Sequence, residues 1–272
     1  MPAVASAPVV VGIDGSQAAI NAAVWAVAEA AHRDVTLRVV YVAPGGAASL
    51  ATDDSAGLER EFGIAALDTV SAAVQATGQH VNVETDVMYG DASAVLIEQS
   101  RSAGLVCLGS TGVGVVTGRI LGSAALDVAE HALCSVVIIR VPHGEALAGP
   151  DWIVVSVDDS TTDAGVVDFA MTEASVRQAP VMAVGVWSAD FGETPYDELD
   201  RRVEGWRARH PGVRIYAVTD RGTVARFLAE DVVDSVQLAV IGSGDVHQVA
   251  HILGPQRPSF IAHGYCSVAI VR

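Results

Sequence analysis

The stretch VVGIDGS at residues 10–16 recurs as VVSVDDS at residues 154–160, 144 positions further along the chain. The ends of the two copies also match, because CSV at residues 134–136 recurs at residues 266–268, 132 positions apart. Self-similarity at such an offset is typical of a repeated structural unit. We therefore predict two domains, residues 1–143 and 150–272, of which the second is 12 residues shorter in its middle.

Short apolar runs alternate with longer helical patterns in the first copy. Strands are predicted at residues 8–13, 35–42, 81–87, 105–108 and 136–141. Helices are predicted at residues 16–32, 58–77, 91–102 and 121–132, with Ser16 as an N-cap, Gly78 as a left-handed C-cap and a loop at 44–57. Strands separated by helices imply right-handed crossovers. The predicted fold class is α/β, with two tandem doubly wound, parallel five-stranded sheets flanked by helices.

Composition narrows the possible functions. The net charge of −16 repels phosphate backbones, so we expect no nucleic-acid partner. The chain has no lysine, which excludes a P-loop lysine and a Schiff-base lysine. The most apolar stretch, residues 18–31, contains Asn21 and Glu29, and the amino terminus lacks a signal-peptide pattern. We therefore predict a cytoplasmic protein without a membrane span.

Metal sites and disulfides are not expected. The three cysteines, Cys107, Cys134 and Cys266, lie in or beside apolar runs and are predicted to be reduced core residues. His247 and His251 have the spacing of neighbours on one helix, but no third ligand accompanies them, so a solvated helix face is predicted.

Polar and small residues gather at the predicted carboxyl ends of the strands, where open α/β sheets bind ligands. Asp14 follows the first strand, and a loop with Gly109 and Gly112 follows the fourth. Further along, Arg119 precedes Gly122-Ser123 at the start of a helix. Glycines let backbone N–H groups approach phosphate oxygens, and a helix start favours an anion. The structural alternatives stay open: a plain turn at the glycines, and Asp14 as a cap of the first helix.

These residues resemble the universal stress protein family. The resemblance rests on Gly109-x-x-Gly112, nine residues and Gly122-Ser123, and on the VGIDGS opening. Gly90-Asp91-Ala92 and the Cys-Ser-Val of the last strand also match. The resemblance implies strand order 3-2-1-4-5, pairing of domains through the fifth strand, adenine near Asp14 and the Val42 backbone, and phosphates at the glycines and Ser123. It also implies regulation under stress rather than fast catalysis.

The predicted ligand is an adenine nucleotide, ATP with or without Mg²⁺. The candidate binding residues are Gly12, Asp14, Val42, Gly109, Gly112, Arg119, Gly122, Ser123 and Ala124. The predicted partners are an unidentified protein and a second copy of the chain in a homodimer, or the two halves form an intramolecular pseudo-dimer. No catalytic residue is assigned, since none is committed to activating water. A slow ATPase and a ligand-free dimerising interaction module remain as alternatives.

The second copy departs from the motif. Its loop reads Gly242-Ser243-Gly244-Asp245, and after Gly254 the serine is replaced by Pro255, which has neither a hydroxyl nor an N–H. Asp159 replaces the glycine of the first turn. Added carboxylates repel a triphosphate, so we predict a weak or absent second site.

Overall fold

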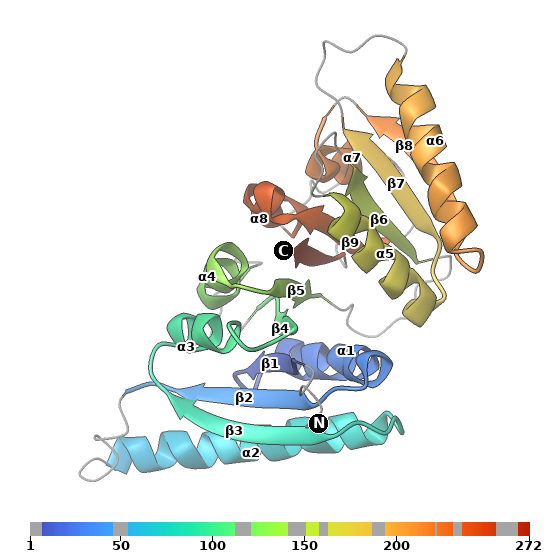
Figure 1. The fold of residues 1–272 in the computed structure, drawn as a ribbon. Coiled ribbons are helices and arrows are strands. Elements are labelled where there is room, and N and C mark those ends of the chain that lie inside the picture. Colours follow the sequence, from blue (N-terminus) through green and yellow to red (C-terminus); the bar gives the residue numbers. More distant parts are fainter. Residues whose placement is uncertain are drawn as a thin grey trace. The chain divides into compact units, whose positions relative to one another are not determined.

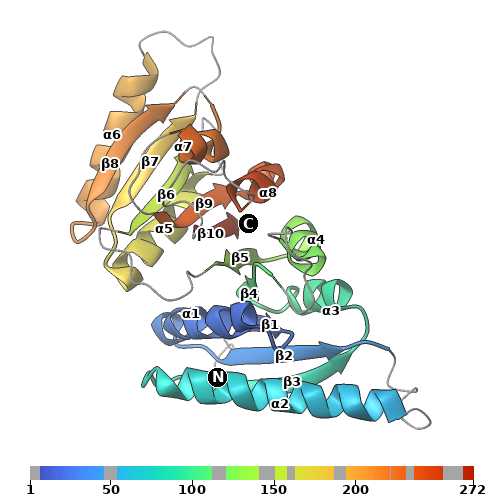
Figure 2. The ribbon, with the colours of Figure 1, turned by 180° about the vertical axis from the view of Figure 1, so that it is seen from behind.

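The chain forms two compact units, Met1–Arg140 and Val141–Arg272, in a computed structural model. Each unit is an α/β domain, as Figures 1 and 2 show from opposite sides. The structure describes residues 7–45, 54–111, 121–140, 151–157, 163–186, 194–220, 222–230, 236–253 and 266–272. The predicted α/β class, with parallel strands flanked by helices, is confirmed.

Strands and helices alternate through the first unit (Figure 1). The order is β1 (Val9–Ile13), α1 (Gln17–Arg33), β2 (Leu37–Ala43), α2 (Asp54–Ala76), β3 (Val83–Tyr89), α3 (Ala92–Gln99), β4 (Leu105–Gly109), α4 (Ser123–His131) and β5 (Ser135–Ile139). Neighbouring strands follow the order β3-β2-β1-β4-β5, and all pair in parallel. The strand order therefore reverses between β1 and β4, where open α/β sheets bind ligands.

The side chains of β4 show that helices cover both faces of this sheet. An ideal Cβ on Gly109 would point into the backbone of Ala18 in α1. The preceding residue, Leu108, packs where Gly12 of β1 meets Leu96 of α3. Because consecutive strand residues point to opposite faces, α1 and α3 lie on opposite sides of the sheet. Contacts join α1 to α2 and α3 to α4, so each face carries one pair of helices.

The second unit repeats this arrangement. Its elements are β6 (Trp152–Val157), α5 (Asp163–Arg177), β7 (Val181–Val186), α6 (Thr194–Arg209), β8 (Ile215–Asp220), α7 (Val224–Glu230), β9 (Val236–Gly242), the 3₁₀ helix η2 (Ser243–Gln248), α8 (Val249–Ile252) and β10 (Ser267–Val271). Neighbouring strands follow the order β8-β7-β6-β9-β10, again in parallel.

Several predicted boundaries were wrong. The segment 44–57 was predicted as a loop, but α2 begins at Asp54, four residues before the predicted start. Strand β3 begins two residues later than predicted and continues to Tyr89. Helix α4 begins at Ser123 rather than at Leu121. Apolar periodicity locates an element well, but it does not mark the turns at which a helix starts in polar sequence.

The predicted solvated face of His247 and His251 is confirmed, because both residues are exposed; His247 lies in η2 and His251 in α8, which follows it directly. One prediction about a single residue needed correction. Cys107 and Cys266 are buried and unbridged as predicted, but Cys134 is only half-buried at the turn before β5. Among the described residues, no helix is long and apolar enough to cross a membrane, and no cluster of three metal-ligating side chains occurs.

Candidate nucleotide site

The turn between β1 and α1 is built by three consecutive residues. Asp14 is half-buried, and its Oδ1 accepts a hydrogen bond from the backbone N–H of Ser16 at 3.0 Å. Gly15 has φ +84°, a left-handed conformation that favours glycine. The Ser16 hydroxyl accepts from the Ala19 N–H at 3.1 Å, so Ser16 is the N-cap of α1, as predicted. Asp14 therefore folds the turn but does not itself cap the helix.

Hydrogen bonds close the base of the glycine loop that follows β4. The Ser110 N–H donates to the Ile139 carbonyl at 3.0 Å, which extends the pairing with β5. The Gly122 N–H donates to the Ser110 carbonyl at 2.9 Å, so these two residues lie side by side. The Ser16 hydroxyl lies 3.3 Å from the Thr111 carbonyl and donates to it. The β1–α1 turn and the glycine loop are thereby held side by side.

The start of α4 differs from the starts of two other helices of this unit. Ser16 caps α1 and Asp91 caps α3 with side-chain oxygens. The N-cap of α4 is Gly122, which makes no side-chain cap, and Ser123 is the exposed first helical residue. The first N–H groups of a helix lack intrahelical partners, and the helix dipole adds partial positive charge there. The α4 start can therefore accept an anion.

The start of α3 is already occupied by its own side chains. The Asp91 carboxylate accepts from the Ser93 hydroxyl at 2.7 Å and from the Ala94 N–H at 2.9 Å. These hydrogen bonds hold the pKa of Asp91 below its ordinary value. The Gly90-Asp91-Ala92 motif thus forms a capped helix start, and Gly90, at φ +139°, donates its N–H to the Ala43 carbonyl at 3.0 Å.

Two of the predicted glycines have packing roles. A Cβ on Gly109 would lie 2.6 Å from the Ala18 carbonyl carbon of α1, which is fixed backbone. A Cβ on Gly12 would lie 2.7 Å from the Leu108 side chain and 2.8 Å from that of Leu96. Glycine is needed at Gly109 for the close packing of α1 against β4, whereas a methyl group at Gly12 would require the ends of two leucine side chains to move.

Two more of the predicted residues, Val42 and Ala124, lie at or near the same edge of the sheet. Val42 is half-buried in β2 and pairs with Met88 of β3, while Ala124 is the half-buried second residue of α4. Gly112 and Arg119 lie outside the described residues. Because β2, β1 and β4 are parallel neighbours, the structure brings the ends that carry Val42, Asp14 and Gly109 to one edge.

Comparisons with known proteins agree with this architecture. The sequence model of the Universal stress protein family matches residues 7–140. The universal stress protein Rv2624c of Mycobacterium tuberculosis (strain ATCC 25618 / H37Rv) is 42% identical over 97% of this chain and 96% of its own. The chain belongs to the universal stress protein family. A second universal stress protein of that strain, Rv3134c, is 38% identical over 97% of this chain and 95% of its own.

A solved member of the universal stress protein family shares the fold over nearly the whole chain. The crystal structure of a universal stress protein from Archaeoglobus fulgidus DSM 4304 superposes with a TM-score of 0.70 at 16% identity. The match covers 98% of this chain and 96% of that one. At this identity the match bears on the fold alone.

The second unit ends its corresponding strand differently. After Gly242 the chain turns directly into η2, and the Gln248 Nε2 donates to the Asp245 carboxylate at 2.7 Å. The buried Gln248 side chain also accepts from the Ala225 N–H at 3.2 Å, near the start of α7. Polar groups of the second unit therefore form hydrogen bonds with one another in the segment that follows β9. Asp158, Asp159 and Pro255 lie outside the described residues.

Sequence reasoning missed an aromatic cluster beside Asp14. Phe62 of α2 packs edge-to-face on Tyr41 of β2, with ring centroids 6.0 Å apart. The Tyr41 hydroxyl donates to the Glu59 carboxylate at 3.3 Å. Burial, the Glu59 charge and hydrogen bond, and the charge of Asp14 raise the pKa of Tyr41 to about 12. The only available signal was the aromatic residue at the end of the predicted second strand, which gave no hint of its helical partner.

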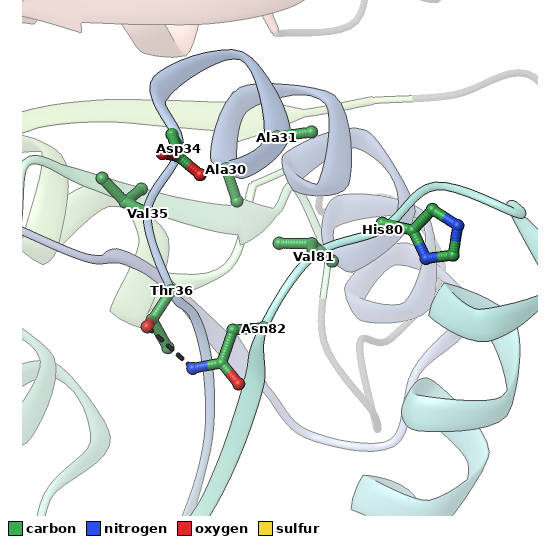
Figure 3. Close-up of a pocket in the computed structure, with 8 residues that line it drawn as sticks. All are labelled: Ala30, Ala31, Asp34, Val35, Thr36, His80, Val81 and Asn82. Carbon is green, nitrogen blue, oxygen red and sulfur yellow. Dashed lines mark hydrogen bonds between the residues drawn. The ribbon is translucent and has the colours of Figure 1, made fainter.

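A separate pocket lies at the opposite edge of the first unit, where α1 ends and β2 and β3 begin (Figure 3). Asp34, at φ 53°, and His80 lie at its rim. Thr36 and Asn82 bond to each other across 3.0 Å. None of the predicted binding residues lines this pocket.

Proposed function

We propose that the first unit binds one adenine nucleotide at the carboxyl ends of β1 and β4, and that its occupancy controls binding to a protein partner during stress. ATP, with or without Mg²⁺, is the proposed ligand. The cytoplasmic location, and a homodimer or an intramolecular pair of units, stay predictions. Membership of the universal stress protein family supports the regulatory role, and the geometry of the edge supports the ligand.

The proposal rests on two neighbouring features. The start of α4 lacks a side-chain cap, and the two ends of the glycine loop after β4 are joined by the hydrogen bond from the Gly122 N–H to the Ser110 carbonyl. The Ser16–Thr111 bond holds the β1–α1 turn against this loop, so Asp14 and the start of α4 serve one site. Ser123 offers a hydroxyl and a backbone N–H to a phosphate there. Gly122 contributes by shaping the turn, because its own N–H bonds to the Ser110 carbonyl.

The residues divide into a phosphate end and a base end. Ser123 and Ala124 at the start of α4 would hold the phosphates, together with Gly112 and Arg119 of the loop. Asp14 and the backbone of Val42 would accept hydrogen bonds from the ribose or base. The chain's role is to bind and orient the nucleotide, since no described side chain is committed to activating water. A bound nucleotide can shift the protein between states only through different affinities for them.

The decisive measurement is the nucleotide content of the purified protein. We expect denatured protein to release ATP at about one molecule per chain, because glycine-rich anion sites can retain phosphates tightly. If none is released, ATP with Mg²⁺ is titrated calorimetrically, and absence of binding there would overturn the proposal. A ratio of about two would show that the second unit also binds, contrary to the weak or absent second site predicted from its altered loop.

A further inference from the structure

The two copies differ in the connection between their second and third strands. Leu37 and Val181, which begin the aligned pairings of β2 and β7, are 144 positions apart, whereas Val83 and Ile215 of β3 and β8 are 132 apart. The first copy therefore has 12 additional residues in this connection. Helix α2 is 23 residues long and α6 only 16, so part of the addition lengthens the amino-terminal end of α2.

This end of α2 carries apolar side chains that the fold leaves in water. Leu58 is 66% exposed and Phe62 is 49% exposed. Large apolar side chains in solvent that adjoin one another are candidates for a binding surface. Glu59, one turn before Gly63 in α2, accepts a hydrogen bond from the Tyr41 hydroxyl, so this end of α2 is also attached to β2.

The exposed ring of Phe62 lies directly against the turn of the proposed site. Its Cζ is 3.0 Å from the position of a Cβ on Gly15, the residue after Asp14. Tyr41 contacts the Phe62 ring edge-to-face. Tyr41 also packs closely against Gly63 of α2, because a Cβ at Gly63 would lie only 2.4 Å from the Tyr41 Cδ1. The ring is thus held in one place with half of its surface free.

The described part of the second copy has no tyrosine at the position of Tyr41. Ile13 pairs with Tyr41 in the first unit, and the corresponding pair in the second is Val157 with Gly185. A glycine therefore stands where the first unit has its anchoring tyrosine. Among the described residues, this tyrosine-supported aromatic surface occurs in the unit whose loop keeps the glycine–serine motif.

We propose that Phe62, supported by Tyr41, is the surface on which the base of the bound nucleotide packs. This inference rests on the proposed function and adds a specificity element to it. A purine has a flat apolar face and an edge with hydrogen-bonding groups. The Phe62 ring supplies the apolar contact, and the Asp14 carboxylate, one residue from Gly15, supplies an acceptor for an amino or hydroxyl group. Aromatic side chains stack on bases with little dependence on the base, so Phe62 selects for the presence of a base.

Calorimetric titration of the full chain with ATP and with inorganic triphosphate, both with Mg²⁺, tests this role. Phe62→Ala is expected to weaken ATP binding by about tenfold or more and to leave triphosphate binding unchanged. Phe62→Tyr keeps a ring and should bind ATP like the wild type. Ile64→Ala removes another exposed apolar side chain of α2 and should have no effect. Melting curves check that each variant is folded.

Nuclear Overhauser contacts between the Phe62 ring and adenine protons provide the direct readout in the wild-type complex. Contacts to Phe62 together with the selective loss of ATP affinity support the inference. Unchanged ATP affinity in Phe62→Ala, an equal loss for both ligands, or no contact to the ring would overturn it and leave the nucleotide site standing; the apolar end of α2 would then be assigned to a protein partner. Failure of the wild type to bind ATP would overturn the proposed function as well.

Discussion

Gly109 and Gly242 end corresponding strands in the two units, yet a methyl group would meet different surroundings at each. At Gly109 it would lie 2.6 Å from the Ala18 carbonyl carbon of α1, whereas at Gly242 the nearest atom is a methyl carbon of Val166 at 3.7 Å. The first distance is a clash with backbone and the second is ordinary van der Waals contact. Loss of ligand binding in a Gly109 variant would therefore report packing as much as phosphate contact.

Substitution of these two glycines separates packing from ligand binding. Gly109→Ala should lower the free energy of unfolding by about 1–3 kcal/mol, because α1 must move away from β4. Gly242→Ala is the matched control and should be close to neutral. Urea unfolding of the ligand-free chain measures both. Equal effects of the two substitutions would show that the close approach of α1 to Gly109 is not a constraint.

Tyr41 should titrate at a higher pH than an ordinary tyrosine. Burial first, then the Glu59 carboxylate and the charge of Asp14, raise its pKa from 10.0 to about 12 in the folded protein. Its contribution to stability is therefore complete below about pH 10 and is lost as the pH rises through about 12. Near-ultraviolet absorbance of tyrosinate measures this, and Tyr41→Phe identifies the step. Glu59→Gln should lower the pKa while leaving it above 10, because burial remains; an unchanged pKa would argue against the Tyr41–Glu59 contact.

At the scale of elements, the sequence predicted what local chemistry determines. Ser16 was identified as the cap of α1 because a hydroxyl before an alanine-rich helix has few other roles. Gly78, at φ +70°, was identified as a left-handed position after α2. The contact of Phe62 with Gly15 joins residues far apart in the chain, and no periodicity encodes it. The same holds for the hydrogen bond from Ser16 to Thr111. The edge of the sheet that carries the site could therefore be predicted from the sequence, but the long-range contacts around the site could not.

The start of α4 provides the sharpest test of the phosphate end. Ser123→Pro removes a hydroxyl and an N–H at the first helical position, where proline is well tolerated. Gly122 has ψ 146°, an extended conformation that suits the residue before a proline. ATP affinity should fall about tenfold or more, since a hydrogen bond to a charged group contributes about 1.5–3 kcal/mol, while the melting temperature changes little.

The matched control for this substitution lies at the start of α3. Ala92→Pro also follows an extended residue, Asp91 with ψ 128°, but this helix start is already capped by its own carboxylate. It should bind ATP like the wild type in the same calorimetric titration. Equal loss in both variants, or none in Ser123→Pro, would contradict a phosphate at α4.

At the scale of the whole molecule, the two units share one topology but differ at the edge where a ligand would bind. The first unit has an α4 start without a side-chain cap and an aromatic surface on a longer α2. The second unit has η2, in which Gln248 bonds to both Asp245 and the Ala225 N–H. Duplication followed by divergence at the loops leaves the sheets alike, because strand packing constrains them, while loops tolerate change.

Hydrogen exchange with and without ATP tests whether the first unit binds nucleotide and the second does not. A ligand that binds only the folded first unit stabilises that unit by about 2.7 kcal/mol at a hundredfold excess over its Kd. Slower exchange is therefore expected in β1, β4 and α4, with little change in β6 and β9, the counterparts of the two strands. The second unit is the internal control, because both units experience the same solvent and ionic strength. Equal protection of β6 and β9 would mean that η2 opens to admit a ligand and that both units bind nucleotide.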